Sequence, residues 1–191
     1  MKKRALALLM AYLALAACAF SSEAPLFAES ESAAPIADGA VFDWRENPEG
    51  ESVVVSFHRV GAGYELRPVS KPDEEPMRGI LFIPVTQTPV EDFIVQIQFK
   101  PDETAATYAF LWRVGDRYRM IVAPPDELEA NASSPFCKQR QMGECGFVAA
   151  ADVRAYYERV LYPVFVTGAA TPENFLELTP TPAPHGGSET R

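Results

Sequence analysis

The sequence predicts a mainly β (β+α) domain, built as an antiparallel meander or small open barrel of about seven strands with one C-terminal amphipathic helix. Three observations support this fold class. Apolar side chains alternate with polar ones along several short segments, which is the period of a strand. Glycine-containing pairs separate some of these segments and suit tight hairpin turns. After residue 150 the apolar spacing becomes that of a helix.

The clearest hairpin lies between residues 108 and 122. Apolar residues occupy the even positions of 108–114 and again of 118–122, and Gly115-Asp116 separates the two runs. Such a two-residue loop needs positive φ angles, which glycine adopts without steric cost. Residues 93–99 alternate in the same way, so we expect the face that carries Gln96 to be exposed to water.

Three further segments complete the predicted sheet. A second hairpin is expected from residues 53–57 through Gly61-Ala62-Gly63 to residues 64–66. Residues 80–85 are continuously apolar, and Pro84 suggests the end or edge of a strand. A short strand over residues 41–45 precedes a turn at 47–50.

One amphipathic helix is predicted over residues 150–162, packed on the sheet or plugging an open end of the barrel. Asp152 suits its first turn, and Pro163 is expected to stop it. Its apolar positions are Val153, Tyr156, Tyr157, Val160 and Leu161.

The chain begins with the pattern of a secretory signal peptide. Lys2, Lys3 and Arg4 precede an apolar stretch over residues 5–17. A helix of that length spans only about 20 Å, which is too short for a bilayer core of about 30 Å. We therefore expect residues 1–17 to be removed on export.

The four residues Leu15-Ala16-Ala17-Cys18 close this segment, and they resemble the lipobox of bacterial lipoproteins. That resemblance implies cleavage before Cys18 and a diacylglyceryl thioether on its sulfur. Because Ala19 rather than aspartate follows, it also implies the periplasmic face of the outer membrane. The folded domain resembles only bacterial lipoproteins without an assigned activity. The alternative is ordinary cleavage near Ala17, which would leave a soluble protein.

The remaining composition divides the exported chain into three parts. Residues 18–38 are rich in Ala, Ser, Glu and Pro, and they predict a lipidated cysteine followed by a flexible tether. Residues 39–168 form the predicted globular domain. Residues 169–191 contain several prolines and a glycine pair, and they predict a disordered tail.

The two cysteines beyond Cys18 predict a disulfide. Cys137 and Cys145 form an even pair in an oxidising compartment, and such a link would stabilise the fold by about 2.5 kcal/mol. The alternative of a redox pair is disfavoured because catalytic dithiols usually have two intervening residues. A zinc site would need further ligands, and His58 and His185 lie far away in sequence.

Charge argues against nucleic-acid binding. Removing residues 1–17 takes away three positive charges and no negative ones, which lowers the formal net charge from −9 to −12. Affinity for nucleic acids depends on Lys and Arg displacing counterions from phosphates. The expected partners are instead the membrane, through the lipid anchor, and another envelope protein.

Motifs of enzyme chemistry are not found in the sequence, and no catalytic residue, metal or cofactor is predicted. His58 falls on the polar face of a predicted strand, and His185 falls in the predicted tail. Acidic clusters such as Glu91-Asp92 are interpreted as solvated turn charges.

Aromatic residues offer the remaining candidate site. A stripe of rings could line a cavity for an apolar guest, although such stripes more often form the core of a small sheet. Trp44, beside a turn, could lie at the rim. The candidate ligand-lining residues are Trp44, Tyr108, Phe110, Trp112 and Tyr118.

The leading hypothesis is therefore a lipid-anchored envelope protein that acts as a binding or interaction module without catalysis. The alternatives are a carrier of a small apolar ligand and an inhibitor of a wall-degrading enzyme such as lysozyme. An enzyme is the least favoured class.

Overall fold

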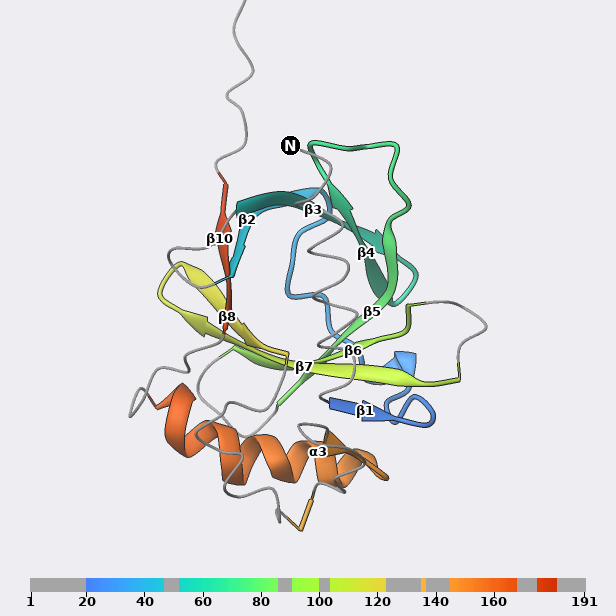
Figure 1. Ribbon diagram of the computed structural model, residues 1–191, viewed down its shortest axis with the longest axis vertical. Helices are drawn as coiled ribbons and strands as arrows, with labels where there is room; N and C mark the ends of the chain where they lie inside the picture. Colours follow the sequence, from blue (N-terminus) through green and yellow to red (C-terminus); the bar gives the residue numbers. More distant parts are fainter. Residues whose placement is uncertain are drawn as a thin grey trace, which may run out of the picture.

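Eight antiparallel strands form a closed barrel in the computed structural model of the chain (Figure 1). The structure describes residues 20–46, 52–85, 91–99, 104–122, 135–136, 145–167 and 175–181. In ring order the barrel strands are β2 (Ala40–Glu46), β3 (Ser52–Val60), β4 (Gly63–Pro68), β5 (Met77–Pro84), β6 (Asp92–Ile97), β7 (Ala106–Val114), β8 (Arg117–Ile121) and β10 (Leu176–Pro180).

The meander follows the predicted turns. Val60 pairs with Gly63 and Val114 pairs with Arg117, so both hairpins close through two residues. Gly61 and Gly115 occupy the first loop positions with φ angles of 61° and 66°. Both primed hairpin turns require a positive φ there, which explains glycine at these positions. The predicted mainly β meander with one C-terminal helix is confirmed.

The barrel is closed rather than open, and β10 is the strand that closes it. Leu178 of β10 pairs with Trp44 of β2 on one side and with Tyr118 of β8 on the other. The predicted disordered tail, residues 169–191, is therefore wrong for residues 175–181. Phe175, Leu176 and Leu178 are buried, and this burial offsets the conformational entropy lost when the segment becomes ordered.

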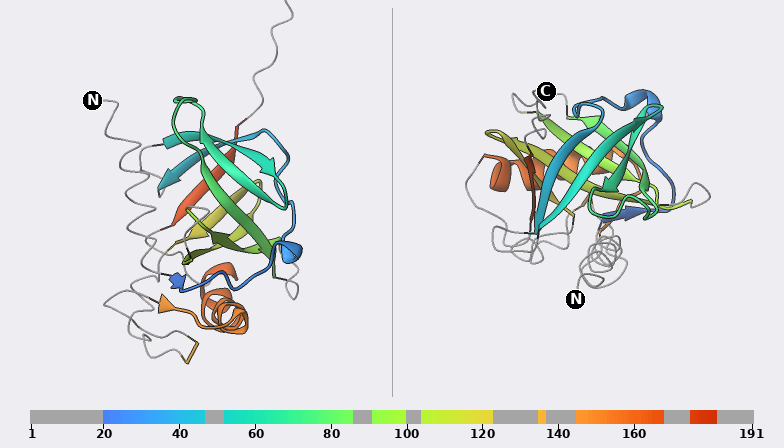
Figure 2. Two further views of the ribbon diagram at one scale, coloured as in Figure 1. Left: turned by 90° about the vertical axis from the view of Figure 1, so that its right-hand side faces the viewer. Right: turned by 90° about the horizontal axis from the view of Figure 1, so that it is seen from above.

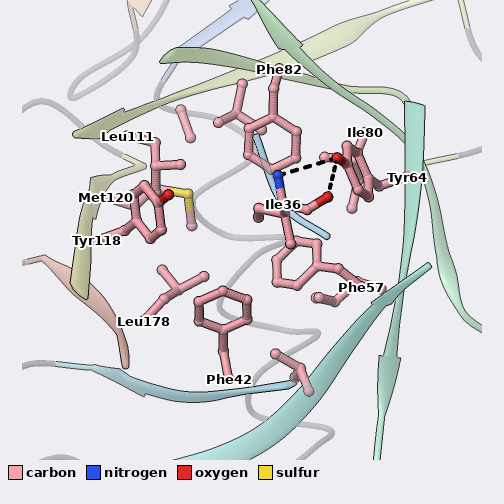
Figure 3. Packing of buried hydrophobic residues seen from close by; sticks show 14 of the residues in the cluster. Ile36, Phe42, Phe57, Tyr64, Ile80, Phe82, Leu111, Tyr118, Met120 and Leu178 are labelled. Carbon is pink, nitrogen blue, oxygen red and sulfur yellow. Dashed lines mark hydrogen bonds between the residues drawn. The ribbon is translucent and has the colours of Figure 1, made fainter. Parts of the chain in front are cut away.

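Large side chains fill the barrel interior (Figure 3). Aromatic rings from neighbouring strands contact one another there. The ring centroids of Phe42 and Phe57 are 5.6 Å apart, and those of Tyr64 and Phe82 are 5.2 Å apart. The Tyr64 hydroxyl donates to the Ile36 carbonyl at 2.6 Å, and the Ile36 N–H donates back at 3.3 Å. Ile36 thus joins the interior cluster from outside the barrel strands. An eight-stranded barrel is just wide enough for such a filling.

A second apolar cluster lies on the outer face of β5, β6 and β7. All six residues of β6 are buried, so the expectation of a water-exposed face carrying Gln96 is wrong. The reason is that a helical layer and the N-terminal segment cover this face. The barrel contributes residues such as Ile83, Ile94 and Phe110, and the covering layer contributes Phe20, Phe27, Phe147, Val153, Tyr157, Leu161 and Phe165.

The helical layer is longer than predicted. It begins as an α-helix, α3 (Ala150–Tyr156), and continues as a π-helix, η2 (Tyr157–Val166), through Pro163. Proline disrupts an α-helix because it lacks an N–H and clashes with the preceding turn. The wider π turn tolerates it, and the Thr167 N–H still bonds to the Tyr162 carbonyl five residues back at 3.1 Å. Within the described residues, no helix is long and apolar enough to cross a membrane.

The predicted flexible tether over residues 18–38 is wrong for its described part. Phe20 opens a short strand, β1 (Phe20–Ser22), which pairs with β7 and, in parallel, with β9 (Cys145–Gly146). A 3₁₀ turn, η1 (Glu29–Glu31), follows, and Ala33 then bridges to Phe82 of β5. We call residues 20–36 the N-terminal strap. Phe20, Phe27 and Ile36 are all buried. The polar residues around them led the sequence analysis to predict a flexible segment instead.

Gln96 fastens the strap to the barrel. Its side-chain oxygen accepts hydrogen bonds from the N–H groups of Leu26 and Phe27, each at 3.0 Å. Its amide nitrogen donates to the Phe27 carbonyl at 3.1 Å. The Tyr108 hydroxyl, 2.8 Å from Ser22 Oγ, also accepts from the Leu26 N–H at 3.1 Å. These bonds satisfy backbone groups that would otherwise be buried without partners.

We predict that Gln96→Leu lowers the free energy of unfolding by about 2 to 3 kcal/mol. Leucine fits the apolar surroundings but removes the acceptor of the Phe27 N–H and leaves the Leu26 N–H with the Tyr108 hydroxyl alone. The control is Ser52→Leu, which adds the same side chain at an exposed position of β3. Urea titration of both variants is the measurement. Equal stability of the two variants would show that the strap does not depend on Gln96.

Burial raises the pKa of the phenols of Tyr64, Tyr108, Tyr118, Tyr156 and Tyr157 above their ordinary value of about 10. The folded state therefore keeps these protons where the unfolded chain loses them. Their contribution to stability is complete below about pH 10 and declines as the pH rises above it. We expect phenolate absorbance from these residues to appear together with the loss of β circular dichroism. Ionisation of these five phenols near pH 10 in a protein that stays folded would contradict this expectation.

Candidate functional site

The helical layer lies on the side of the barrel away from β3 and β4 (Figure 2). The outer face of these two strands carries a cluster of polar side chains. Residues 56 and 58 of β3 and 65 and 67 of β4 point outward, because their neighbours Phe57, Tyr64 and Leu66 belong to the interior cluster. We call this cluster the β3–β4 polar face. Its members are Asp38, Ser56, His58, Glu65, Arg67 and Arg78.

The hairpin register brings these residues together. Ser56 pairs with Arg67, and His58 pairs with Glu65. Side chains of directly paired residues lie on the same face of a sheet at contact distance. The two-residue turn at Gly61 fixes this register, so the sequence feature that predicts the hairpin also positions the polar face.

Glu65 lies at the centre of the ionic part of this face. Its carboxylate lies 2.5 Å from Arg67 Nη2 and 3.6 Å from Arg78 Nε. The Glu65 side chain is only 10% exposed, whereas those of Arg67 and Arg78 are 43% and 59% exposed. A nearly buried carboxylate needs such partners, because an unpaired charge there would be costly. Arg67 is therefore held by a hydrogen bond from its Nε to this carboxylate at 2.7 Å, whereas Arg78 lies beside it in a longer ion pair and remains more exposed.

Ser56, His58 and Asp38 lie in the order of a catalytic triad. Ser56 Oγ is 3.0 Å from His58 Nε2, and His58 Nδ1 is 4.0 Å from Asp38 Oδ1. The second distance is too long for the hydrogen bond that orients a catalytic histidine. Asp38 Oδ1 instead accepts the Arg59 N–H at 2.9 Å. In this structure, therefore, Ser56 and His58 are joined by a hydrogen bond, and Asp38 does not complete a hydrogen-bonded triad with them.

A second group of ion pairs continues around the outer wall of the barrel. Glu177 of β10 lies 2.7 Å from Arg117 and 3.7 Å from Arg119 of β8. On β2, Arg45 pairs with Asp43 at 2.9 Å. Arginine is enriched at protein interfaces because it combines several donors with a planar, weakly hydrated cation. The uncovered wall therefore presents paired but accessible guanidinium groups.

The predicted aromatic site does not form as one surface. Trp44 and Tyr118 point into the barrel interior, whereas Tyr108, Phe110 and Trp112 lie on the outer face under the helical layer. The register explains the division: Tyr118 pairs with Arg113, which lies on the opposite face of β7 from Trp112. All five are core residues, which was the alternative that the sequence left open.

Asp92 corrects another expectation. The sequence suggested a solvated turn charge, but Asp92 is buried and accepts a hydrogen bond from the Tyr157 hydroxyl. This contact ties η2 to the start of β6. Its neighbour Glu91 remains exposed and lies 2.6 Å from Arg113.

The predicted cysteine sites are described only in part. Cys145 is buried in β9, while Cys18, Cys137 and also His185 lie outside the described residues. Lipidation of Cys18 and a disulfide between Cys137 and Cys145 therefore stay predictions. Within the described ranges, no group of three or more His, Cys, Asp or Glu side chains could hold a metal ion.

The sequence placed His58 on the polar face of a strand, but it did not show which polar residues surround it. The polar residues at positions 56 and 58, and at 65 and 67, alternate with apolar ones on both sides of the predicted turn. Pairing these positions across the hairpin would have brought them together. The positions of Arg78 and Asp38 could not be predicted, because they depend on a bulge in the β4–β5 pairing and on the path of the segment between the strap and β2.

Comparisons with known proteins do not identify the chain: no family model, no curated protein and no solved structure matches it.

Proposed function

We propose that this chain is an exported lipoprotein, anchored through Cys18, whose barrel binds another envelope protein through the β3–β4 polar face. The sequence supports the anchor through the basic start, the short apolar stretch and Leu15-Ala16-Ala17-Cys18. The proposed address is the periplasmic face of the outer membrane. Its placement there rests on Ala19, which follows the cysteine.

The observation that carries the binding role is the arrangement of Glu65 between Arg67 and Arg78. The contacts with Glu65 hold the Arg67 guanidinium in place before any partner arrives, so less of its side-chain entropy remains to be lost on binding, and Arg78 adds a second cation beside it. Ser56 and His58 add neutral hydrogen-bonding groups beside them. A partly exposed polar surface on the outer wall of the barrel suits a protein partner better than a small molecule, which usually binds in a concave, mostly apolar pocket.

The alternative role as an apolar-ligand carrier finds less support. An observation in its favour is the indole N–H of Trp44, which is buried in the interior and has no hydrogen-bond partner among the described residues. Against it, mutually contacting rings from β2 to β6 occupy the interior, together with aliphatic side chains such as Leu111, Met120 and Leu178 from β7, β8 and β10 (Figure 3). The other alternative, inhibition of a wall-degrading enzyme, would be one form of protein binding through an outer face.

We predict that a photo-crosslinking amino acid at His58 yields a discrete adduct in intact cells, whereas the same residue at Asp116 does not. Asp116 is the matched control because its side chain is 89% exposed but lies in the β7–β8 hairpin, away from the polar face. Arg67→Glu should greatly reduce the His58 adduct, because the fixed guanidinium becomes a repelling carboxylate. Equal adducts from both positions, or none from either, would contradict the proposal.

The lipid anchor is tested separately, on protein purified from the cells that express it. Peptide mapping without reductant should find Cys18 carrying lipid and Cys137 linked to Cys145. Because the chain has three cysteines, a link between Cys18 and Cys145 is the alternative pairing that this mapping distinguishes. A Cys18–Cys145 link would exclude the thioether and overturn the lipoprotein assignment, even if the polar face binds a protein.

A further inference from the structure

The fold begins almost at the proposed anchor. Phe20, two residues after Cys18, is fully buried. Its ring lies 5.1 Å from that of Phe110, 5.4 Å from that of Tyr156 and 6.0 Å from that of Phe147. These contacts connect the barrel, the helical layer and the β9 region. Phe20 therefore cannot leave its position without opening the outer core.

Chain geometry limits the distance between lipid and fold. Two residues span at most about 7 Å when fully extended. A flexible tether over residues 18–38 would have reached about 25 Å on average. Because the strap is folded, the first strand of the domain lies within about 7 Å of a lipidated Cys18. The barrel then has little freedom to move away from the lipid surface.

The ring order determines which side of the barrel faces that surface. β1 is attached to β7, and β3 is four strands away from β7 in either direction around the eight-stranded ring. β3 is therefore the strand opposite β7. Both views show β1 and the helical layer on one side of the barrel and β3 on the other (Figures 1 and 2). The β3–β4 polar face consequently points away from the anchored strand.

The surface beside β1 is compatible with a lipid headgroup region. The Phe147 N–H donates to the Ser21 carbonyl at 2.8 Å, and the next residue, Val148, is 55% exposed. Ala149 is exposed as well. This pair is apolar and uncharged, so it does not add to the repulsion that acidic residues meet at an anionic membrane, whereas Glu23, directly after β1, is exposed and acidic.

We propose that the mature protein lies directly on the lipid surface through its β1 and helical side, so that the β3–β4 polar face is presented outward. This orientation rests on the lipid anchor of the proposed function. It adds that the partner approaches from the side opposite the membrane and that the chain itself, rather than a tether, sets the height of the binding face.

Energy transfer to labelled lipid headgroups tests this orientation. Lipidated protein is placed in phosphatidylcholine vesicles that contain a headgroup-labelled acceptor, with a donor dye on Val148→Cys or on His58→Cys. Opposite barrel walls are separated by roughly 10 Å, and the helical layer adds about 10 Å more, so we expect transfer from position 148 to be at least about twofold more efficient. The matched control inserts a Gly/Ser tether of about twenty residues between Ala19 and Phe20, which should equalise the two positions.

The outcomes separate the two proposals. Failure of the protein to associate with vesicles overturns the anchor, and with it this orientation. Association with equal transfer from both positions overturns the orientation alone. Higher transfer from position 58 would show that the polar face lies on the membrane, which also contradicts the orientation.

Discussion

The outer walls of β6 and β7 carry apolar side chains as large as those on their inner walls. Ile94, Phe110 and Trp112 point outward, while Phe93, Val95 and Leu111 point into the barrel. A strand with two apolar faces is stable only when both faces are covered. This requirement explains why a simple meander acquires a helical layer, and why the N-terminal segment folds against the barrel.

The two covering elements are joined to the barrel by polar contacts as well as by apolar packing. Tyr157 of η2 donates to the buried Asp92, and the strap is held by Gln96. Arg154 of α3 connects the elements, because its guanidinium lies 5.0 Å from the Phe27 ring and 3.3 Å from Glu31. One side of the molecule is thus a double layer, whereas the opposite wall remains a single sheet with a polar exterior.

The sequence was sufficient for features that depend on local periodicity. Gly61 and Gly115 marked their hairpins, and the switch to helical spacing near Val153 marked α3. It was insufficient where isolated apolar residues in polar surroundings act through distant contacts. Phe20, Phe27 and Ile36 are too widely spaced to show a period, and their partners are Phe110, Tyr108 and Tyr64.

Other failures have a similar origin. The alternation Leu176-Glu177-Leu178 was visible but short, and only closure between β2 and β8 gives it a role. Gln96 appeared to mark a wet face because a single sequence does not reveal which external segment will cover a strand. The candidate site could be predicted in part, because the hairpin pairs Ser56 with Arg67 and His58 with Glu65. Asp38 and Arg78 could not be placed, since they depend on the segment between the strap and β2 and on a bulge in the β4–β5 pairing.

The outward orientation of the polar face depends most on the strap being part of the cooperative fold. Native-state hydrogen exchange of the Leu26 and Phe27 amides tests this directly, because both N–H groups bond to Gln96. Exchange as slow as that of the barrel amides, with the same dependence on denaturant, is the expected result. Exchange at the rate of an unstructured chain would mean that residues 20–36 form a tether after all, and the outward orientation of the polar face would lose its basis.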